Sequence, residues 1–321
     1  MKIIVTGGAG FIGSHLTTAL LERGERVVVI DNFNDFYDPA IKRENIDLFS
    51  SNPDFKLYEA DIRDTDVVAA IFRDEKPDAV CHLAARAGVR PSIELPVLYE
   101  QVNCLGTLNL LEAARKCGSP NFVFASSSSV YGINSKVPFS EADPITCPIS
   151  PYASTKRAGE LMCYTYSHLY KLPVTCLRFF TVYGERGRPD MAVAKFTKLI
   201  CDGSGIEVYG DGSAQRDFTY VSDIVDGIVN SIYKRSAYEI INIGGAKTIE
   251  VKRLIELIES ALGIKASVRY GEIMPGDVPI TYADVTKARN LLGFSPKVRI
   301  EEGVQRYVKW FLARRSRLGG A

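Results

Sequence analysis

The sequence has no two cysteines close enough in the chain to form a CxxC zinc or redox motif. Its seven cysteines are never closer than 13 positions, and their spacing gives no disulfide framework. The three histidines, His15, His82 and His168, are too dispersed to indicate a metal site, so we expect structural roles for them. These absences favour a reduced, cytoplasmic protein without a metal centre.

The sequence also lacks an excess of one charge and a long apolar run. Its 39 lysines and arginines nearly cancel its 38 aspartates and glutamates, so no global field favours nucleic acid or an anionic membrane. No stretch approaches the roughly eighteen uninterrupted apolar residues that a membrane helix needs. Met1 and Lys2 run directly into the apolar segment Ile3–Val5, so we expect no signal peptide. We predict a soluble protein without nucleic-acid or membrane partners.

What the sequence does contain is a regular alternation of short apolar runs and amphipathic segments. This alternation is typical of a parallel sheet covered by helices. The apolar runs are Ile3–Val5, Arg26–Ile30, Lys56–Tyr58, Ala79–Leu83, Asn121–Ala125 and Val174–Phe179. We predict an α/β fold with a Rossmann-type, doubly wound parallel sheet and a smaller, mixed α/β substrate-binding lobe.

The regularity decays after about residue 180, which divides the chain into two predicted domains. Residues 1–180, with a return segment at about 214–245, would form the sheet domain, and residues 181–213 and 246–321 the smaller lobe. We expect a return strand at Glu239–Ile243 and a loose tail at Arg314–Ala321. The amphipathic segments of the lobe predict helices near Ala192–Asp202, Val251–Leu262 and Glu301–Leu312.

A glycine cluster between the first strand and the first helix predicts a dinucleotide site. Gly7, Gly10 and Gly13 would let the backbone turn tightly and approach a pyrophosphate at the helix N-terminus. Asp31 ends the next strand, where a carboxylate accepts both adenosine-ribose hydroxyls and repels a 2′-phosphate, which favours NAD over NADP. Lys42 and Arg43 are expected on a solvated helix face.

A tyrosine and a lysine four residues apart predict the reactive group. Tyr152 and Lys156 would project from one face of a helix, where the ammonium lowers the pKa of the phenol and makes it a usable proton acceptor. A hydroxyl from the serine run Ser126–Ser129 could hydrogen-bond the phenolate and a substrate oxygen. Together with the glycine cluster, this pair predicts hydride chemistry.

These motifs resemble the extended short-chain dehydrogenase/reductase family along nearly the whole chain. The resemblance rests on Thr6–Gly13, Asp31-Asn32, Asp61-Ile62, the serine run before Val130-Tyr131-Gly132, and Tyr152–Lys156. Within this family the sequence is most similar to the nucleotide-sugar 4-epimerases, in which a hydroxyl residue four positions before the tyrosine of the VYG motif assists catalysis. That residue is Ser127 here.

The resemblance also implies which residues bind the cofactor and the nucleotide. Asn103 would belong to a proton relay or to a packing network, and Asp61-Ile62 would flank the adenine, although an aspartate there also fits a helix cap. Arg216 and Asp277 would hold the diphosphate and ribose, and Tyr209 would stack on uracil or pack in the core. The implied NAD-binding set is Gly7, Gly10, Phe11, Ile12, Gly13, Asp31, Asn32, Asp61, Ile62, Leu83, Ala84, Ala85, Asn103, Tyr152 and Lys156.

Two segments narrow the resemblance to the UDP-glucuronate 4-epimerase branch. Arg178–Ala192 and Phe33–Arg43 are similar to that branch, whereas glucose/galactose epimerases usually carry asparagine at Thr181 and arginine at Met274. Arg188 could provide the missing guanidinium. The implied pocket for the sugar and its linkage therefore includes Ser128, Ser129, Thr181, Arg188 and Met191.

Oxidation of C4 in a hexuronate creates a ketone β to the carboxylate, and such keto acids readily lose carbon dioxide. Neutral hydroxyls from Ser127–Ser129 and Thr181 would restrain that carboxylate without protonating it. Arg90 is either its charge partner or an exposed loop arginine. We expect Tyr152 to take the C4 hydroxyl proton as hydride leaves for NAD, and the keto sugar to rotate before both return.

Several alternatives remain at this stage. A UDP-glucose/UDP-galactose 4-epimerase would share the glycine cluster, base and nucleotide anchors, and a UDP-glucuronate decarboxylase would share the oxidation. A 4,6-dehydratase would need an acidic pair where Ser128-Ser129 stand, and a non-catalytic NAD-binding regulator would not need an intact Tyr152 and Lys156. The resemblance, together with the apolar faces of Val97–Lys116 and Tyr152–Tyr170, implies a four-helix homodimer interface.

Overall fold

The computed structural model describes residues 1–272 and 276–319 and is built around one seven-stranded parallel sheet. Its strand order is β11-β6-β5-β4-β1-β2-β3. The strands β2 and β3 follow on one side of β1 and the later strands on the other, so the strand order reverses between the parallel neighbours β1 and β4. Open α/β sheets bind ligands at such a switch point. The strands are β1 (Lys2–Thr6), β2 (Arg26–Asp31), β3 (Phe55–Glu59), β4 (Ala79–His82), β5 (Asn121–Ser127), β6 (Val174–Phe179) and β11 (Tyr238–Ile243). The predicted α/β, Rossmann-type fold is confirmed.

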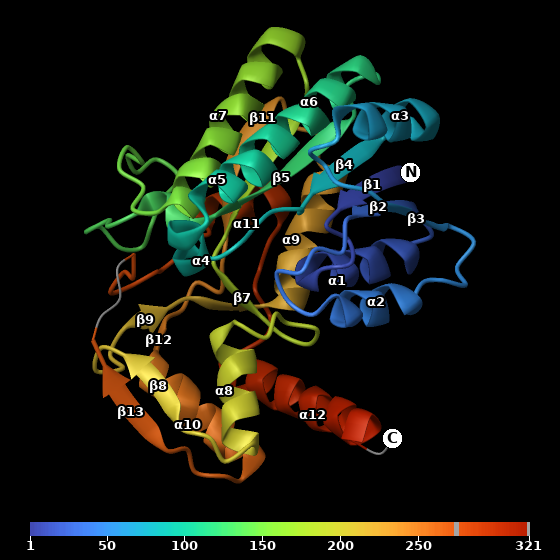
Figure 1. Cartoon of the computed structure of the whole chain (residues 1–321). Helices are drawn as coiled ribbons and strands as arrows, with labels where there is room; N and C mark the ends of the chain where they lie inside the picture. The colour runs from blue at the N-terminus through green and yellow to red at the C-terminus, as the bar shows by residue number, and fades with distance from the viewer. Residues whose placement is uncertain (273–275, 320–321) are drawn as a thin grey trace.

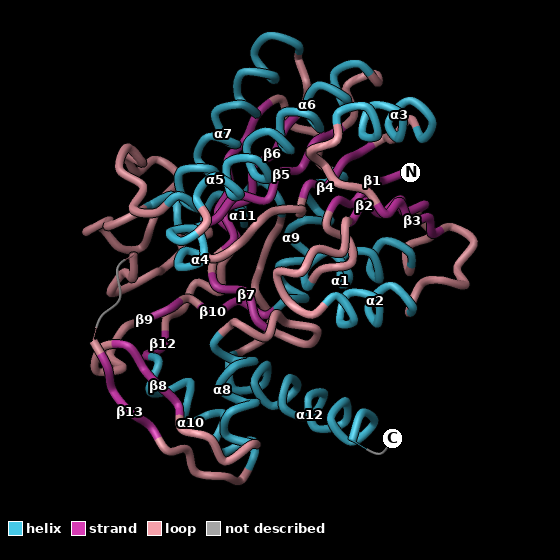
Figure 2. The backbone as a smooth tube through the Cα atoms, viewed as in Figure 1, coloured by secondary structure: helices cyan, strands magenta, loops and turns pink. Residues whose placement is uncertain are grey.

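Alternating side chains of these strands bury two separate apolar layers, and helices lie on both faces of the sheet (Figures 1 and 2). Ile3 and Val5 belong to the layer that includes Leu16 of α1, whereas Ile4 belongs to the layer that includes Leu110 of α6. Both faces of the sheet are therefore covered, as the apolar strands require. The covering helices are α1 (Phe11–Leu21), α2 (Pro39–Asp47), α9 (Val221–Tyr233) and α11 (Thr286–Leu292) on the first layer, and α3 (Thr65–Glu75), α6 (Gly106–Lys116) and α7 (Pro151–Tyr170) on the second.

The segment predicted as one amphipathic stretch over Val97–Lys116 is divided. It contains α5 (Pro96–Tyr99), a π-helical turn over Glu100–Leu105, and α6, and is preceded by α4 (Val89–Glu94). The carbonyl of Asn103 accepts the hydroxyl of Thr107, which competes with the regular helical bond. Turns of this kind often occur at functional sites in helices.

The smaller lobe lies beyond the carboxyl ends of the strands (Figure 1). It contains α8 (Ala192–Cys201), β8 (Ile206–Tyr209), α10 (Val251–Leu262), β13 (Val268–Gly271) and α12 (Ile300–Gly319). The strands β8 and β13 pair in parallel. Two short pairs lie toward the sheet domain: β7 (Thr181–Tyr183) with β10 (Phe218–Tyr220), and β9 (Gln215–Arg216) with β12 (Ile249–Glu250).

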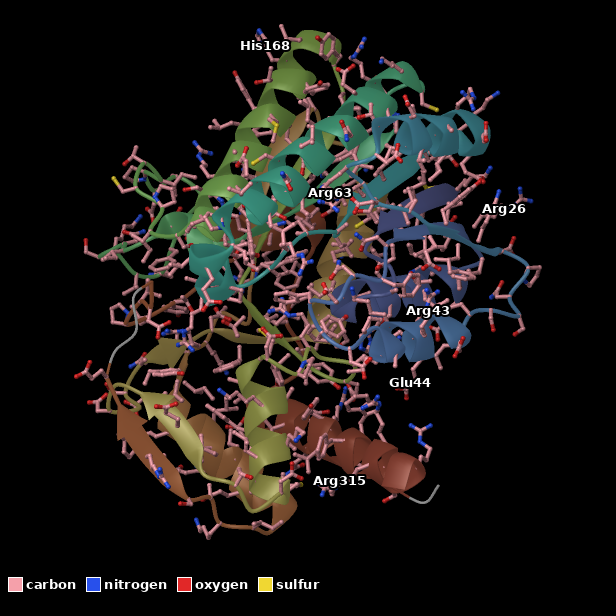
Figure 3. All side chains as sticks on the ribbon, viewed as in Figure 1. Arg26, Arg43, Glu44, Arg63, His168 and Arg315 are labelled. Carbon is pink, nitrogen blue, oxygen red and sulfur yellow. The ribbon has the colours of Figure 1, made fainter. Side chains whose placement is uncertain are left out.

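The predicted loose tail is wrong for most of its length, because α12 continues to Gly319. Arg314 pairs with Glu44 of α2 at 2.6 Å, and Arg315, labelled in Figure 3, pairs with Asp202 at 2.7 Å. The apolar periodicity of the sequence ends near Leu312. The local pattern therefore does not predict the last turns of α12, which these contacts with distant residues hold in place. Over the described ranges, no helix is both long and apolar enough to cross a bilayer.

Candidate active site

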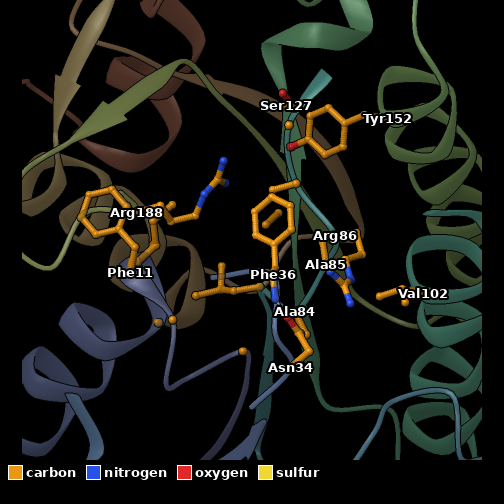
Figure 4. A pocket seen from close by; sticks show the side chains of 18 of the residues that line it. Phe11, Asn34, Phe36, Ala84, Ala85, Arg86, Val102, Ser127, Tyr152 and Arg188 are labelled. Carbon is orange, nitrogen blue, oxygen red and sulfur yellow. Dashed lines mark hydrogen bonds between the residues drawn. The ribbon is translucent and has the colours of Figure 1, made fainter. Parts of the chain in front are cut away.

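A cavity of about 580 Å³ opens between the carboxyl ends of the strands and the smaller lobe (Figure 4). It is lined by residues from the six strands β1 to β6 or the loops that follow them, and by β7 and the segment after it. The predicted residues that it brings together are Gly7, Gly10, Phe11, Ile12, Gly13, Asp31, Asn32, Asp61, Ile62, Leu83, Ala84, Ala85, Ser127, Ser128, Ser129, Tyr152, Lys156, Thr181, Arg188 and Met191.

The glycine cluster forms a turn that only glycine fits. Gly7 has φ +70°, and a Cβ on Gly13 would lie 2.2 Å from the carbonyl oxygen of Gly7. Gly10 caps α1 without a side-chain hydrogen bond, so the first N–H groups of the helix face the cavity. This geometry fits the pyrophosphate of a dinucleotide.

Asp31 is fixed at the end of β2 by two backbone N–H groups. Ala9 donates to one carboxylate oxygen at 3.1 Å and Phe33 to the other at 2.9 Å. Burial raises the pKa of Asp31, and the nearby Lys42 and these N–H groups oppose the shift. A carboxylate held at this point suits the ribose hydroxyls of a dinucleotide.

The expectation for Lys42 is wrong, whereas Arg43 is exposed as expected. Lys42 is buried, lines the cavity and donates to the carbonyl of Asn34 at 2.9 Å. The loop after β2 folds back over α2 and covers it. Arg43 lies 3.6 Å from the ring centroid of Phe33 and pairs with Glu59 at 2.6 Å.

Asp61 lies in the cavity and is oriented by two neighbours. Asn32 donates to it at 2.8 Å, and Arg63 binds it through two guanidinium nitrogens at 3.0 and 2.8 Å. The bond from Arg63 holds the pKa of Asp61 at about 2. The cap of α3 is Asp64, which accepts from Val67 at 3.1 Å, so the alternative cap role for Asp61 is excluded.

Tyr152 stands at the first turn of α7 with Ser127 and Arg188 beside it (Figure 4). Burial raises the pKa of Tyr152, and a hydrogen bond with Ser127 and the positive charge of Arg188 lower it. Ser127 ends β5 and also accepts the N–H of Ser129 at 3.1 Å. The phenol therefore has a hydroxyl partner and a cation, both directed at the cavity.

Lys156 lines the same cavity as Tyr152, and its ammonium is bound by β5. Its ammonium donates to the carbonyl of Ala125 at 2.7 Å, and burial lowers its pKa to about 8. The cation that lowers the pKa of Tyr152 in this arrangement is Arg188. The spacing correctly places both residues at the cavity, but it does not show where the ammonium points.

Four residues predicted to contact the nucleotide or sugar lie near one another but do not line this cavity: Arg90, Tyr209, Arg216 and Asp277. Arg90 pairs with Asp277 at 2.8 Å and lies 4.1 Å from the ring centroid of Tyr209. Burial lowers the pKa of Arg216, Asp277 opposes that shift and Arg90 adds to it. Arg90 thus lies beside the predicted nucleotide anchors Asp277 and Tyr209, and its side chain is 40% exposed. Met274 lies outside the described residues.

Asn103 has a packing role. It is buried, accepts the backbone N–H of Arg86 at 2.8 Å, and donates to the Arg86 carbonyl and to Thr155, both at 3.0 Å. It thus fixes the loop after β4 against α7.

Phe36 and Arg86 are among the cavity residues that sequence reasoning did not single out. The Phe36 ring centroid lies 5.6 Å from the guanidinium carbon of Arg86 and 5.3 Å from that of Arg188 (Figure 4). Arg86 directly follows Leu83–Ala85 at a strand end, which was an available signal for a cavity position.

Two of the three histidines, His82 and His15, form hydrogen bonds typical of a structural role. His82 is buried and bonds Thr6 at 2.8 Å and Thr107 at 2.9 Å. His15 bonds the carbonyl of Glu185 at 2.8 Å, and burial lowers its pKa to about 3. His168 lies on the exposed surface of α7.

Comparisons with known proteins agree with this geometry. Residues 4–307 match the family model described as GDP-mannose 4,6 dehydratase. A UDP-glucuronate 4-epimerase of Thermodesulfobacterium geofontis is 44% identical over 96% of this chain and 95% of its own. The crystal structure of a Bacillus cereus UDP-glucuronic acid 4-epimerase with UDP-glucuronic acid and NAD has a TM-score of 0.92 and 37% identity, and covers 98% of this chain and 100% of its own. A Thermotoga maritima UDP-glucose 4-epimerase with UDP-glucose has a TM-score of 0.91 and 36% identity, with coverage of 98% and 99%.

Proposed function

Because the chain belongs to the extended short-chain dehydrogenase/reductase family, within the group described as GDP-mannose 4,6 dehydratase, we propose that it is an NAD-dependent UDP-sugar 4-epimerase. Its substrate pair is UDP-glucuronate and UDP-galacturonate. The observation that carries this proposal is one cavity in which the glycine turn, Tyr152, Ser127 and the polar residue Thr181 meet.

NAD, when bound, accepts the C4 hydride of the sugar and later returns it. The turn at Gly7–Gly13 and the first N–H groups of α1 hold the pyrophosphate, and Asp31 binds the adenosine ribose. Asp61, which lines the same cavity, would flank the adenine. Epimerisation restores the oxidised cofactor, so the protein must bind it without releasing it in each turnover.

Tyr152 is the general base and acid. Its phenolate takes the proton of the C4 hydroxyl and returns it to the carbonyl after the sugar has turned. Ser127 donates to the phenolate and Arg188 stabilises the negative charge, and both effects favour the deprotonated form. Lys156, held at Ala125, lines the same cavity and would place a positive charge near the bound cofactor.

The sugar pocket must hold a carboxylate while the β-keto acid exists. Ser128, Ser129 and Thr181 line the cavity near Ser127 and offer neutral hydrogen bonds. A carboxylate that keeps its charge and its orientation is poorly placed to leave as carbon dioxide. This pocket favours a hexuronate over a neutral hexose, whose C6 hydroxyl would use fewer of these donors.

Inversion requires the sugar to rotate while its nucleotide stays in place. Tyr209 and Asp277 of the smaller lobe, with Arg90 and Arg216 of the sheet domain, would anchor the UDP moiety where the two domains meet, with Tyr209 beside the uracil. We therefore assign residues 1–180 and about 214–245 to the NAD-binding domain, and residues 181–213 and 246–321 to the nucleotide-sugar-binding lobe.

The decisive experiment supplies purified protein separately with UDP-glucuronate and UDP-glucose and identifies the products. We expect UDP-galacturonate from the first and much slower conversion of the second. Efficient conversion of UDP-glucose would favour the alternative that the Thermotoga maritima structure represents. UDP-pentose and carbon dioxide would instead identify a decarboxylase, and a 4-keto-6-deoxy sugar a dehydratase.

We also propose a homodimer through the outer faces of α6 and α7. These faces expose Leu108, Leu161, Tyr164 and Leu169, a set too apolar to be only solvated. Light scattering should give the mass of two chains for the wild type and one for Leu161→Glu. Val67→Glu, on the exposed face of α3, should remain dimeric. A monomeric wild type at micromolar concentration would refute the interface.

The cell compartment that we propose is the cytoplasm. All seven cysteines are free thiols, and four of them are buried.

A further inference from the structure

A fully buried ion pair lies directly behind the catalytic residues. The side chain of Glu160 on α7 is 0% exposed and that of Arg178 on β6 is 1% exposed. Arg178 binds both carboxylate oxygens, at 2.8 and 2.9 Å, and Arg157 adds a third contact at 3.0 Å. A buried ion pair rarely makes a fold more stable than apolar residues of similar volume would. Stability therefore does not explain this pair, and we consider instead which neighbouring residues it holds in place.

Glu160 connects α7 to the strand that carries Ser127. Ser126, the residue before Ser127, donates its hydroxyl to Glu160 at 2.6 Å. One helical turn earlier, Lys156 donates to Ala125, the residue before Ser126, at 2.7 Å. Successive turns of α7 are thus fastened to successive residues of β5, next to the point where Ser127 meets Tyr152.

The close approach of α7 and β5 depends on a glycine between these two contacts. A Cβ on Gly159 would lie 2.3 Å from the ring of Phe124 on β5. Any larger residue would push the helix from the strand and lengthen both bonds. The separation of the helix and the strand is therefore set within narrow limits.

The same ion pair reaches the turn that carries the other serines. Arg178 donates to the hydroxyl of Tyr131 at 2.9 Å, and Tyr131 donates to Asn242 of β11 at 2.7 Å. Tyr131 ends the short 3-10 helix Ser128–Tyr131. The base on α7 and the hydroxyls of this turn consequently share one buried carboxylate as their common support.

We propose that Glu160 is a positioning residue for epimerisation, acting through Ser126 to fix the distance between the Ser127 hydroxyl and the Tyr152 phenol. This inference rests on the proposed function and deepens it. Because the hydrogen bond from Ser127 lowers the pKa of Tyr152, a longer bond raises that pKa. The buried carboxylate thereby sets the pH range in which the base works.

Ser126→Ala tests this role with little risk to the fold, because Glu160 keeps its contacts with Arg178 and Arg157. A matched control is Ser167→Ala, a buried serine on the same helix that donates to the carbonyl of Ala237 at 2.7 Å. Each variant removes one buried hydroxyl that forms a hydrogen bond between α7 and a neighbouring segment. Only Ser126 lies next to the candidate active site. Ser126→Thr, which keeps a hydroxyl, is the rescue variant.

We expect Ser126→Ala to lower kcat by roughly tenfold, in line with the sensitivity of catalysis to small misplacements. The KM for UDP-glucuronate and the content of bound NAD should stay at wild-type values, and the acidic limb of the kcat–pH profile should move to higher pH. Ser167→Ala should show none of these changes, and Ser126→Thr should recover most of kcat.

A Ser126→Ala enzyme with wild-type kcat and pH profile would overturn the proposal, and so would equal effects of Ser126→Ala and Ser167→Ala. The double variant Glu160→Leu/Arg178→Met removes both fully buried charges, and the charge that loses its partner, on Arg157, is on a side chain that is 28% exposed. It should fold and bind NAD but show the same shifted profile. If the wild type itself converts no UDP-sugar, the proposed function fails instead, so the two failures are distinguishable.

Discussion

The ammonium of Lys156 donates a 2.7 Å hydrogen bond to the carbonyl of Ala125, on the strand that ends at Ser127. The lysine is therefore part of the junction between α7 and β5 and is also a charge at the floor of the cavity. Burial lowers its pKa to about 8, so it remains mostly protonated at neutral pH. Its two roles can be separated by experiment.

Lys156→Met should lose both roles. We expect kcat to fall by about 100-fold or more, as for other acid–base machinery. The unpaired carbonyl of Ala125 should reduce the free energy of unfolding by about 1–3 kcal/mol. Lys116→Met, on the exposed surface of α6, is the control and should change neither quantity. Turnover assays and thermal melts measure the two effects, and unchanged turnover would exclude Lys156 from the reaction.

Arg188→Gln should shift the pH dependence of turnover. The guanidinium lowers the pKa of Tyr152, so its removal raises that pKa, and the acidic limb of the kcat–pH profile should move to higher pH. The rate loss is largest at low pH and diminishes as pH rises. Arg90→Gln should weaken nucleotide binding and leave the limb in place, because Arg90 pairs with Asp277. Identical limbs in Arg188→Gln and wild type would contradict the account.

Gly13→Ala should abolish cofactor retention. Its methyl group would lie 2.2 Å from the carbonyl oxygen of Gly7, so the turn must open. The comparison is Gly205→Ala, where the new methyl group meets its nearest atom at 3.7 Å. Absorbance and mass spectrometry of the purified proteins report bound NAD. We expect almost no bound NAD in Gly13→Ala and a wild-type amount in Gly205→Ala. Full NAD occupancy in both variants would refute the assignment of the glycine turn to cofactor binding.

Glu75→Gln should make stability less dependent on acid pH. Glu75 accepts from Lys56 and Tyr58 at 2.6 Å and from Lys2 at 3.0 Å, and these bonds hold its pKa at about 2 against the effect of burial. A lowered carboxyl pKa stabilises the fold above about pH 4.5, and this stabilisation is lost as pH falls toward 2. The variant should therefore be less stable at pH 7, by about 1 kcal/mol, and match the wild type near pH 2.

The control for this comparison is Asp74→Asn. Asp74 pairs with Arg73 at 3.3 Å, and both side chains are largely exposed, so the pair should contribute little at any pH. Urea unfolding at several pH values measures both variants. A constant difference between Glu75→Gln and wild type from pH 7 to pH 2 would show that the charge of Glu75 has no role.

The sheet and the cavity residues at its edge could be predicted because local patterns determine them. Apolar runs located β1 to β6, and the glycine spacing located the cofactor turn, since a Cβ is excluded there. The helical period placed Tyr152 and Lys156 at one cavity. These features depend on residues that are close together in the chain.

The features that the sequence did not predict all depend on contacts between distant segments. Lys42 is buried by the loop that folds back from β2, and Arg90 meets Asp277 across 187 positions of the chain. The end of α12 is held by Glu44 and Asp202, far from it in sequence. The direction of the Lys156 ammonium depends on β5, which a spacing within one helix does not report.

The central claim is that the hydride removed from C4 returns to the same carbon from the opposite side. UDP-glucuronate deuterated at C4, converted in ordinary water by enzyme with bound NAD, tests it directly. We predict that UDP-galacturonate keeps the deuterium at C4, because hydride on the cofactor does not exchange with solvent. Loss of the label to water would contradict the account and would require a C4 proton abstraction in which the phenol and the cofactor do not cooperate.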